Sequence, residues 1–292
     1  MRRREFLGSA FCVSALTPHG IAEAAEPDLR ISLAEWSLHR AIQSRLITNL
    51  DFPRIAREQF GIEGLEFVNQ LWEAPTQSYV QRLKSNIQKT GTRAVLIMCD
   101  GEGFMGHSGK AERMRAARNH YKWVDISAEL GGHAIRVNMD SDLKGSTPAE
   151  VQSIIGYSAE SFADLCQYAA RQNINVLIEN HVGVSLYPDP IVQVIKQVGL
   201  PNFGTLPDSG NWPKGLDRYE AVGKLMPFAK GVSCKFWDFA PSGEESTIDS
   251  ARLMKIIRDS GYKGWIGIEY EGTRLTEFEG IQAAKRVLER FL

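Results

Sequence analysis

The sequence predicts an α/β protein that forms a single (β/α)8 barrel, the TIM-barrel fold. Apolar, β-branched runs typical of buried strands alternate with helical patterns eight times along the chain. The 292 residues are 43% hydrophobic, and no linker rich in proline or glycine divides them. Eight strand–helix pairs favour a closed parallel barrel. The alternative, a doubly wound open sheet, usually has a glycine-rich phosphate loop after its first strand, and residues 35–38 do not form one.

The expected elements follow from apolar spacing and from residues that begin or end helices. Tyr79, Leu83 and Ile87 have helical spacing, and Gly91 ends that helix. A Thr147-Pro148 pair begins another helix, and a capping box begins the last one at Thr276. The expected strands are 29–35, 62–68, 94–98, 134–137, 174–179, 203–207, 231–234 and 265–268. The expected helices are 52–60, 76–89, 111–130, 149–172, 190–198, 217–229, 248–260 and 276–291.

Composition excludes two classes of protein. The 34 basic residues nearly balance the 35 acidic ones, whereas a nucleic-acid-binding protein should carry a basic surface. No segment approaches the roughly 18 consecutive apolar residues that a membrane span needs. We therefore expect neither a nucleic-acid partner nor a membrane span; the composition does not predict the oligomeric state.

The first 25 residues read as a twin-arginine-type export signal that precedes a barrel at 29–292. Residues 2–4 are arginines, a mildly apolar stretch covers 11–16, and Ala22-Glu23-Ala24 resembles a small-x-small cleavage site. We therefore expect a periplasmic or secreted protein; a cytoplasmic basic tail is the alternative. Twin-arginine export carries folded proteins, which suits a chain that acquires its metal before export.

Acidic residues come at equivalent places after three of the expected strands. Glu179 ends the fifth strand, Asp208 follows the sixth and Glu269 follows the eighth. The carboxyl ends of parallel barrel strands meet at one rim, which carries the chemistry of such barrels. We expect the three carboxylates to share one site; the alternative is that each pairs separately with an arginine or lysine.

A shared site of this kind requires a positive centre. Carboxylates about 4 Å apart repel by about 4 kcal/mol per pair at an effective dielectric constant of 20. A divalent cation held by Glu179, Asp208 and Glu269, either Mn²⁺ or Mg²⁺, would offset that repulsion. Lys235, just after the seventh strand, is the other candidate cation. Three acids and one lysine carry a net charge of −2, and a divalent ion brings the total to zero, which favours the metal.

Several polar side chains at the same rim are candidates for substrate binding. Arg136 lies inside the fourth strand and needs an anion, which is either a rim acid or a substrate. Asn138, Asn180 and Asn211 carry amides suited to sugar hydroxyls, although such residues also serve in loops and caps. His181 and Glu271 follow the strand-end acids by two residues. A hydrogen bond within its own loop is the alternative role of His181.

The tryptophans divide into two expected groups. Trp36 and Trp237 come just after strands, where indole rings can pack against the C–H faces of sugars or simply wall the mouth of the barrel. The same position is expected for Trp72 and Trp212, and a core position is expected for Trp123 and Trp265.

The chain from about residue 29 onward resembles the xylose isomerase-like TIM barrels, among them sugar phosphate isomerases/epimerases, tagatose 3-epimerases and inosose dehydratases. The resemblance rests on residues 32–37, 135–138, 179–181, 206–211 and 267–272. It implies that Glu179, Asp208 and Glu269 are three of four metal ligands, and that Glu179 and Glu269 are also acid and base. Lys235 stands where the family has the remaining ligand, a histidine. Either the three carboxylates and water hold the metal, or Lys235 replaces it and one carboxylate is protonated.

These features together predict an isomerase or epimerase that removes a proton next to a carbonyl with the help of a metal. The catalytic residues would be Glu179, Glu269 and Lys235. Export and the lack of a glycine-rich phosphate loop favour a non-phosphorylated sugar, an inositol or a keto-glycoside. The alternatives are a lyase or hydrolase of keto-glycosides with the same enolising site, and a sugar-binding barrel that has lost catalysis.

Overall fold

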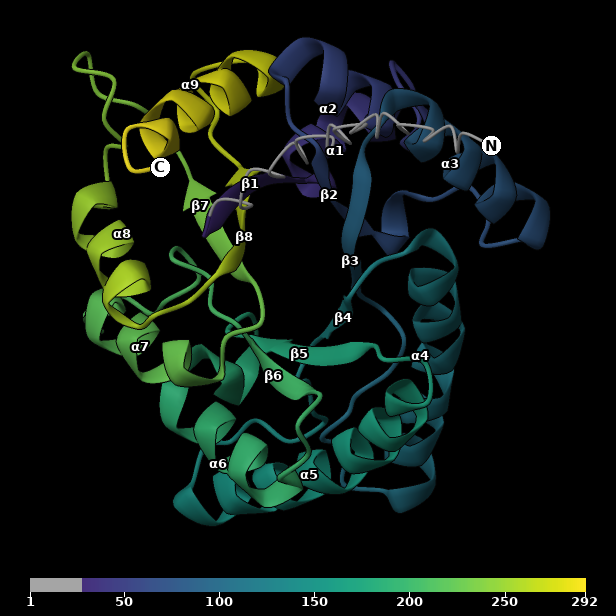
Figure 1. Cartoon of the computed structure of the whole chain (residues 1–292). Coiled ribbons are helices and arrows are strands. Elements are labelled where there is room, and N and C mark those ends of the chain that lie inside the picture. Colours follow the sequence, from purple (N-terminus) through teal and green to yellow (C-terminus); the bar gives the residue numbers. More distant parts are fainter. Residues whose placement is uncertain (1–27) are drawn as a thin grey trace, which may run out of the picture.

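The computed structural model describes residues 28–292, which form a closed barrel of parallel strands surrounded by helices (Figure 1). The expected export signal at 1–25 lies outside the described residues. The barrel prediction is confirmed. The strands are β1 (Leu29–Ala34), β2 (Gly64–Val68), β3 (Arg93–Cys99), β4 (Ala134–Val137), β5 (Asn175–Glu179), β6 (Phe203–Leu206), β7 (Val232–Phe236) and β8 (Gly264–Tyr270).

The strands follow one another in the order β6-β5-β4-β3-β2-β1-β8-β7, and every pair is parallel. Strands β7 and β8 extend beyond the expected ranges. Lys235 and Glu269 therefore lie inside these strands, and they are register partners. This pairing places the lysine beside the acid on the neighbouring strand.

The barrel closes between β6 and β7 through a short set of backbone contacts. Lys230 N–H donates to the carbonyl of Thr205, at 3.0 Å, and Ser233 N–H donates to the carbonyl of Pro207, at 2.9 Å. The segment after β6 then runs beside β7, where Asp208 forms a bridge with Ser233. Closure therefore brings Asp208 against the strand that carries Lys235.

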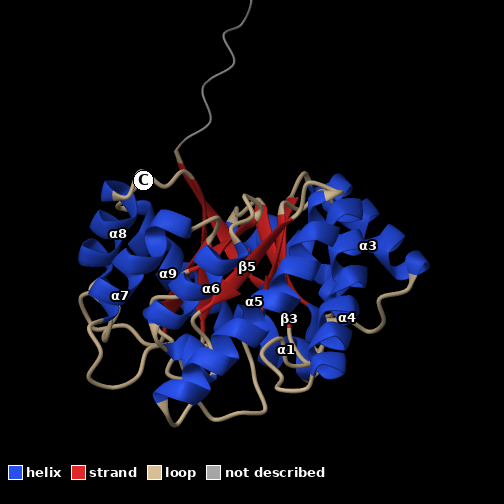
Figure 2. Ribbon diagram, turned by 90° about the horizontal axis from the view of Figure 1, so that it is seen from below, coloured by secondary structure: helices blue, strands red, loops and turns tan. Residues whose placement is uncertain are grey.

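The helices form the outer layer around the strands (Figure 2). A short helix that the sequence analysis did not expect, α1, precedes the first expected one. The helices are α1 (His39–Gln43), α2 (Phe52–Phe60), α3 (Gln77–Thr90), α4 (Lys110–Leu130), α5 (Pro148–Ala170), α6 (Pro188–Val198), α7 (Arg218–Leu225), α8 (Ser250–Asp259) and α9 (Glu277–Glu289). None of the helices in the described part is long and apolar enough to cross a membrane.

Three helix ends have the capping residues that the sequence predicts. The Thr147 side chain accepts a hydrogen bond from Glu150 N–H at the start of α5, where Pro148 takes the first helical position. Thr276 and Glu279 form the expected capping box of α9. Helix α3 ends at Gly91, whose φ of 64° is the left-handed conformation that glycine adopts without strain.

Two tryptophans lie elsewhere than expected. Trp72 was expected at the mouth of the barrel, but it is 8% exposed and packs edge-on against Phe67 and Trp123. Trp265 was expected in the core, but it is only partly buried and carries the guanidinium of Arg30 over its ring. Sequence position alone did not distinguish a strand end that packs under helices from one that faces the opening.

Candidate functional site

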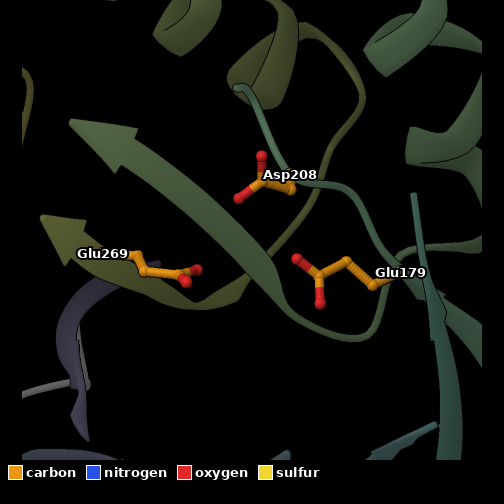
Figure 3. Close-up of side chains that lie close together, drawn as sticks. All are labelled: Glu179, Asp208 and Glu269. Carbon is orange, nitrogen blue, oxygen red and sulfur yellow. The ribbon is translucent and has the colours of Figure 1, made fainter. Parts of the chain in front are cut away.

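Glu179, Asp208 and Glu269, here called the acidic triad, converge at the carboxyl ends of β5, β6 and β8 (Figure 3). One carboxylate oxygen from each lies within 4.8 Å of those of the other two. All three side chains are buried. The sequence analysis expected this convergence, and the parallel barrel produces it from residues up to 90 positions apart.

Lys235 lies against the acidic triad from β7. Its Nζ is 3.0 Å from Glu269 Oε1 and 3.7 Å from Asp208 Oδ2, and it donates a 2.5 Å hydrogen bond to Glu271 Oε1. Burial would lower the pKa of this ammonium, but the carboxylates of Asp208, Glu269 and Glu271 outweigh burial and hold the pKa well above its usual value. These contacts favour the charged, ammonium form of Lys235.

Arg136 projects from β4 onto the other side of the acidic triad. Its Nε is 2.8 Å from Glu179 Oε2, and its terminal nitrogen is 2.5 Å from Asp100 Oδ1. Asn138 donates to the same oxygen of Asp100, at 2.6 Å. The sequence analysis left open whether Arg136 pairs with a rim acid or a substrate; the structure pairs it with two acids, only one of which belongs to the triad.

Asp208 is held by hydrogen bonds on both carboxylate oxygens. Oδ1 accepts the backbone N–H groups of Gly210 and Asn211, each at 2.7 Å. The Ser233 hydroxyl lies 2.7 Å from Asp208 Oδ2 and 2.9 Å from Glu269 Oε2. One hydroxyl proton cannot serve two carboxylates at once, so this pair needs an additional proton or a cation, and Lys235 is the cation that faces both acids in this structure.

The surroundings move the pKa values of the triad in different directions. Burial raises the pKa of Glu179 well above its usual value, and Arg136 offsets this only in part. Burial also raises the pKa of Asp208. Burial would raise the pKa of Glu269 too, but the charge of Lys235 and hydrogen bonds from Lys235 and Ser233 outweigh it and lower the pKa. Glu179 is thus the acid that holds a proton most readily, and Glu269 is the one that stays ionised.

A cavity of about 390 Å³ opens above the acidic triad at this end of the barrel. Glu269 and Glu271 reach its wall, whereas Glu179, Asp208 and Lys235 are buried beside them and do not line it. The lining residues are Trp36, Val68, Gln70, Met98, Asp100, Arg136, Asn138, His181, Asn211, Trp237, Glu269 and Glu271. A larger cavity, about 740 Å³, lies at the opposite end and contains none of the expected site residues.

All seven residues expected to bind substrate line the smaller cavity. The Asn211 side chain donates to Glu179 Oε1, at 3.2 Å. Trp36 stacks on His39 with ring centroids 4.6 Å apart, which holds the indole at the wall. The Trp237 ring centroid lies 5.9 Å from Lys235 Nζ. Asn138 and Asn211 both use their amides within the protein, so a sugar would meet amides that are already oriented.

His181 presents a neutral imidazole to the cavity. Burial lowers its pKa to about 4, and the nearby Arg136 lowers it further in the same direction. Its Nδ1 is buried and has no hydrogen-bond partner. Its backbone N–H, rather than its ring, donates to the Ser185 hydroxyl, at 3.2 Å. The ring is therefore free to bond a ligand.

Three participants were not recognised from the sequence. Asp100 follows β3 directly, as the triad acids follow their strands, so its position could have identified it. Ser233 is a small residue within a strand and gave no signal. Glu66 is a lone acid in the middle of an apolar strand, β2, which is itself an indication of a special environment.

Glu66 lies inside the barrel, where burial raises its pKa to about 8. Its Oε1 accepts the Ser32 hydroxyl at 2.6 Å, and its Oε2 is buried without a partner. Gly267 makes the room, because a Cβ there would lie 2.4 Å from Glu66 Oε2. Glu66 is therefore a neutral carboxylic acid over most of the physiological pH range.

We expect Glu66→Gln to change how stability depends on pH. Below pH 4.5 both folded and unfolded chains hold this proton; between pH 4.5 and about 8 only the folded chain does. Because the folded state then binds more protons, the contribution of Glu66 to the unfolding free energy falls as pH rises, by up to about 1.4 kcal/mol per pH unit. Glutamine removes that contribution, so urea unfolding between pH 5 and 8 should show a flatter profile. An unchanged slope would show that Glu66 is ionised in the folded protein.

Asn180 has a structural role rather than the sugar-binding role that its position suggested. It is fully buried, its amide donates to the carbonyl of Asp208 at 3.0 Å, and its oxygen accepts Asp208 N–H at 2.8 Å. Both ends of the side chain are therefore occupied. Asn180 fixes the segment that carries Asp208 relative to β5.

The acidic triad has features of a cation site. Glu179 Oε2 is buried and has no geometrically sound hydrogen bond, despite its 2.8 Å approach to Arg136 Nε. Five carboxyl groups gather here, from Asp100, Glu179, Asp208, Glu269 and Glu271, and among residues 28–292 only Arg136 and Lys235 face them as cations. The triad could hold a metal, because its donors are the oxygens that Mg²⁺ and Mn²⁺ prefer.

Comparisons with solved structures find the same architecture in several proteins. The 3-keto-D-glucoside 4-epimerase of E. coli is 16% identical, with 90% of this chain and 98% of that chain covered and a TM-score of 0.68. An L-ribulose 3-epimerase is 15% identical, with coverage of 90% and 94% and a TM-score of 0.72. The IOLI protein with a binding zinc atom is 14% identical, with coverage of 90% and 97% and a TM-score of 0.72. At identities this low, the structural matches establish a shared fold.

Sequence comparison is more specific about the family. A search of curated proteins gives no match. The model of the xylose isomerase-like TIM barrel family, however, matches residues 54–291, which include every strand except β1. The match confirms the resemblance seen in the strand-end motifs, and this chain belongs to the xylose isomerase-like TIM barrel family.

Proposed function

We propose that this protein is a sugar isomerase or epimerase that removes a proton next to a carbonyl of a non-phosphorylated sugar, inositol or keto-glycoside. The observation that carries the proposal is the buried acidic triad beside Lys235, under a cavity lined by tryptophans and amides. Two of the similar structures are a 3-keto-D-glucoside 4-epimerase and an L-ribulose 3-epimerase, which supports this reaction class.

The two glutamates of the triad suit different roles. Glu269 lines the cavity and is kept ionised by Lys235, so it is the better base. Glu179 lies across the triad, and burial raises its pKa, so it is the better acid. When their environments push the pKa values of two carboxyl groups apart, one group usually acts as the acid and the other as the base. The proton would leave the substrate to Glu269 and return from Glu179, which lies behind the cavity wall in this structure and would have to become accessible when the substrate binds.

Glu179, Asp208 and Glu269 are the residues that would hold a divalent ion, for which we propose Mn²⁺ or Mg²⁺. When bound, such an ion would stabilise the negative charge that develops on the substrate oxygen. Lys235 contributes positive charge to the same region of the site. The similar IOLI structure carries a zinc atom, which supports a metal but not its identity here.

The charges around the cavity favour a neutral substrate. Among the lining residues, Arg136 is the permanent cation, and it is already paired with Asp100 and Glu179. Glu269 and Glu271 add negative charge to the wall, which would repel a phosphate group. The Arg274 side chain, in the loop after β8, lies 3.1 Å from Asp238 and is paired with it. Trp36 and Trp237 offer apolar ring faces to a sugar.

Hydrogen exchange with solvent tests the proposal directly. The protein, supplied with Mn²⁺ or Mg²⁺, would be incubated in D2O with a panel of ketohexoses, ketopentoses, inososes and 3-keto-glucosides, and deuterium incorporation followed by NMR. We expect label at the carbon next to the carbonyl of at least one compound. No incorporation in any compound would count against enolisation, and sugar binding without exchange would favour a binding protein.

The same enolate allows a second outcome. If a leaving group is attached next to the carbanion, as in a 3-keto-glycoside, returning the proton to the leaving oxygen gives elimination rather than epimerisation. The raised pKa of Glu179 suits it to donate that proton. Product analysis of the exchange reaction would distinguish an epimer from a glycal and a free aglycone, and release of the aglycone would assign the lyase or hydrolase alternative.

We also propose that the protein is exported through a twin-arginine signal, on the evidence of residues 1–25 alone. Mass spectrometry of protein recovered from the periplasm is expected to show a chain that starts after Ala24. An intact Met1 in that fraction would contradict cleavage.

A further inference from the structure

Lys235 takes up the oxygens of the acidic triad that would face a metal ion. Two of the three carboxylates around its Nζ, those of Asp208 and Glu269, belong to the triad. Asp208 Oδ1 accepts two backbone N–H groups, and the Ser233 hydroxyl lies between Asp208 Oδ2 and Glu269 Oε2, to only one of which it can donate. Lys235 faces Asp208 Oδ2 and Glu269 Oε1, so a divalent ion held by the triad would need oxygens that the ammonium now approaches.

The third partner of Lys235 lies outside the triad. Glu271 Oε1 is 2.5 Å from Nζ, and its side chain is 25% exposed at the wall of the cavity, whereas Lys235 is 2% exposed. The ring of Trp237 is also near the ammonium, at 5.9 Å. The lysine thus has an anion and an aromatic face that can keep its charge when Asp208 and Glu269 bind something else.

We propose that Lys235 is an internal cation that competes with a divalent metal ion for Asp208 and Glu269, and that Glu271 retains the ammonium when the metal binds. The inference rests on the metal site of the proposed function and adds how metal binding at that site is regulated. Two cations about 4 Å apart repel strongly even at an effective dielectric constant of about 20, so they do not share these oxygens. Without metal, the lysine partly compensates the buried acids, and the site remains formed.

Metal affinity in a double-mutant cycle tests this competition without any substrate. Mn²⁺ binding would be measured by calorimetry on the metal-stripped full chain, Lys235→Met, Glu271→Gln and the double variant. We expect Lys235→Met to bind at least about tenfold more tightly than the unmodified chain. Glu271→Gln should weaken binding by about fivefold or more, because the ammonium is left with only Asp208 and Glu269.

The double variant separates competition from simple electrostatic repulsion. If Glu271 acts by holding the lysine, Glu271→Gln has little effect once Lys235 is methionine. If Glu271 only adds negative charge to the site, Glu271→Gln weakens Mn²⁺ binding by the same factor in both backgrounds, and the proposal is overturned. Lys263→Met is the matched control, because this exposed lysine pairs with Asp28 at the other end of the barrel; its affinity should equal that of the unmodified chain.

A measurement on the unmodified chain keeps the test independent of how the variants fold. A buried, hydrogen-bonded ammonium exchanges its protons slowly, so ¹⁵N-lysine labelling should give a resonance for Lys235 that exposed lysines do not. Titration with Mg²⁺ is expected to move this resonance over the concentration range in which the ion binds. A resonance that does not move while Mg²⁺ binds would contradict the proposal, as would the absence of Mn²⁺ binding in every folded variant. If no variant binds metal but the metal-free protein still exchanges substrate deuterium, the metal competition is wrong and the proposed enolisation stands.

Discussion

Replacing Glu269 by glutamine is expected to lower the rate of deuterium exchange into the substrate by about a thousandfold. Glutamine has nearly the same shape, and its single carbonyl oxygen can still accept a hydrogen bond from Lys235 while its NH2 group faces the Ser233 hydroxyl, but it cannot take up a proton. The rate would be measured by NMR on the compound that the exchange panel identifies, at saturating substrate and saturating metal ion, so that the loss is assigned to the chemical step. A fall in the turnover rate with a KM that stays nearly constant is the expected pattern.

The control for this experiment is Glu220→Gln, which makes the same chemical change on an exposed surface of α7. Its exchange rate should match that of the unmodified chain. Urea unfolding of Glu269→Gln would establish that the variant is folded. If a folded Glu269→Gln variant retains its exchange rate, another group removes the proton, and Glu179 becomes the next candidate.

Replacing Arg136 by methionine is expected to cost about 3–5 kcal/mol of unfolding free energy. The guanidinium is 4% exposed and faces Asp100 and Glu179 at 2.5 and 2.8 Å. Methionine fills much of the volume but leaves both acids buried without their main counter-charge. Loss of this charge should also raise the pKa of Asp100, which Arg136 now holds below its usual value against the effect of burial.

Urea unfolding followed by tryptophan fluorescence and circular dichroism measures this loss. Arg252→Met is the matched control, since Arg252 is 53% exposed and pairs with Asp217 on the surface; an exposed pair of this kind contributes little. A loss below about 1 kcal/mol for Arg136→Met would show that water or protonation already neutralises the two acids. A partial rescue in the Arg136→Met/Asp100→Asn double variant would confirm that the buried charge is the cause.

The fold could be predicted from the sequence because its elements carry local signals. Helix α2 covers residues 52–60 and strand β4 covers 134–137, both as expected, since capping and apolar spacing act over a few neighbouring residues. Elements with a weak or polar sequence pattern were missed. Helix α1 is only five residues long, and the ends of β7 and β8 are polar, so their pattern resembled loops.

The candidate site could be predicted in part for a related reason. Glu179, Asp208 and Glu269 each follow an apolar run, and the barrel topology turns that common position along the strand into a common position in space. Asp100 follows the same rule. Ser233 and Glu66 do not, because their roles depend on neighbours from other strands, namely Asp208 and Ser32.

By itself, the sequence determined the barrel and the end at which the acids gather, because both depend on periodicity and on the direction of parallel strands. Only the tertiary structure decided how the charges are shared: Arg136 with Asp100 and Glu179, and Lys235 with Asp208, Glu269 and Glu271. The reason is that electrostatic partners are chosen by distances of a few ångströms and by burial. Those quantities arise from the closure of β6 against β7 and the register of β7 on β8, which no single segment encodes.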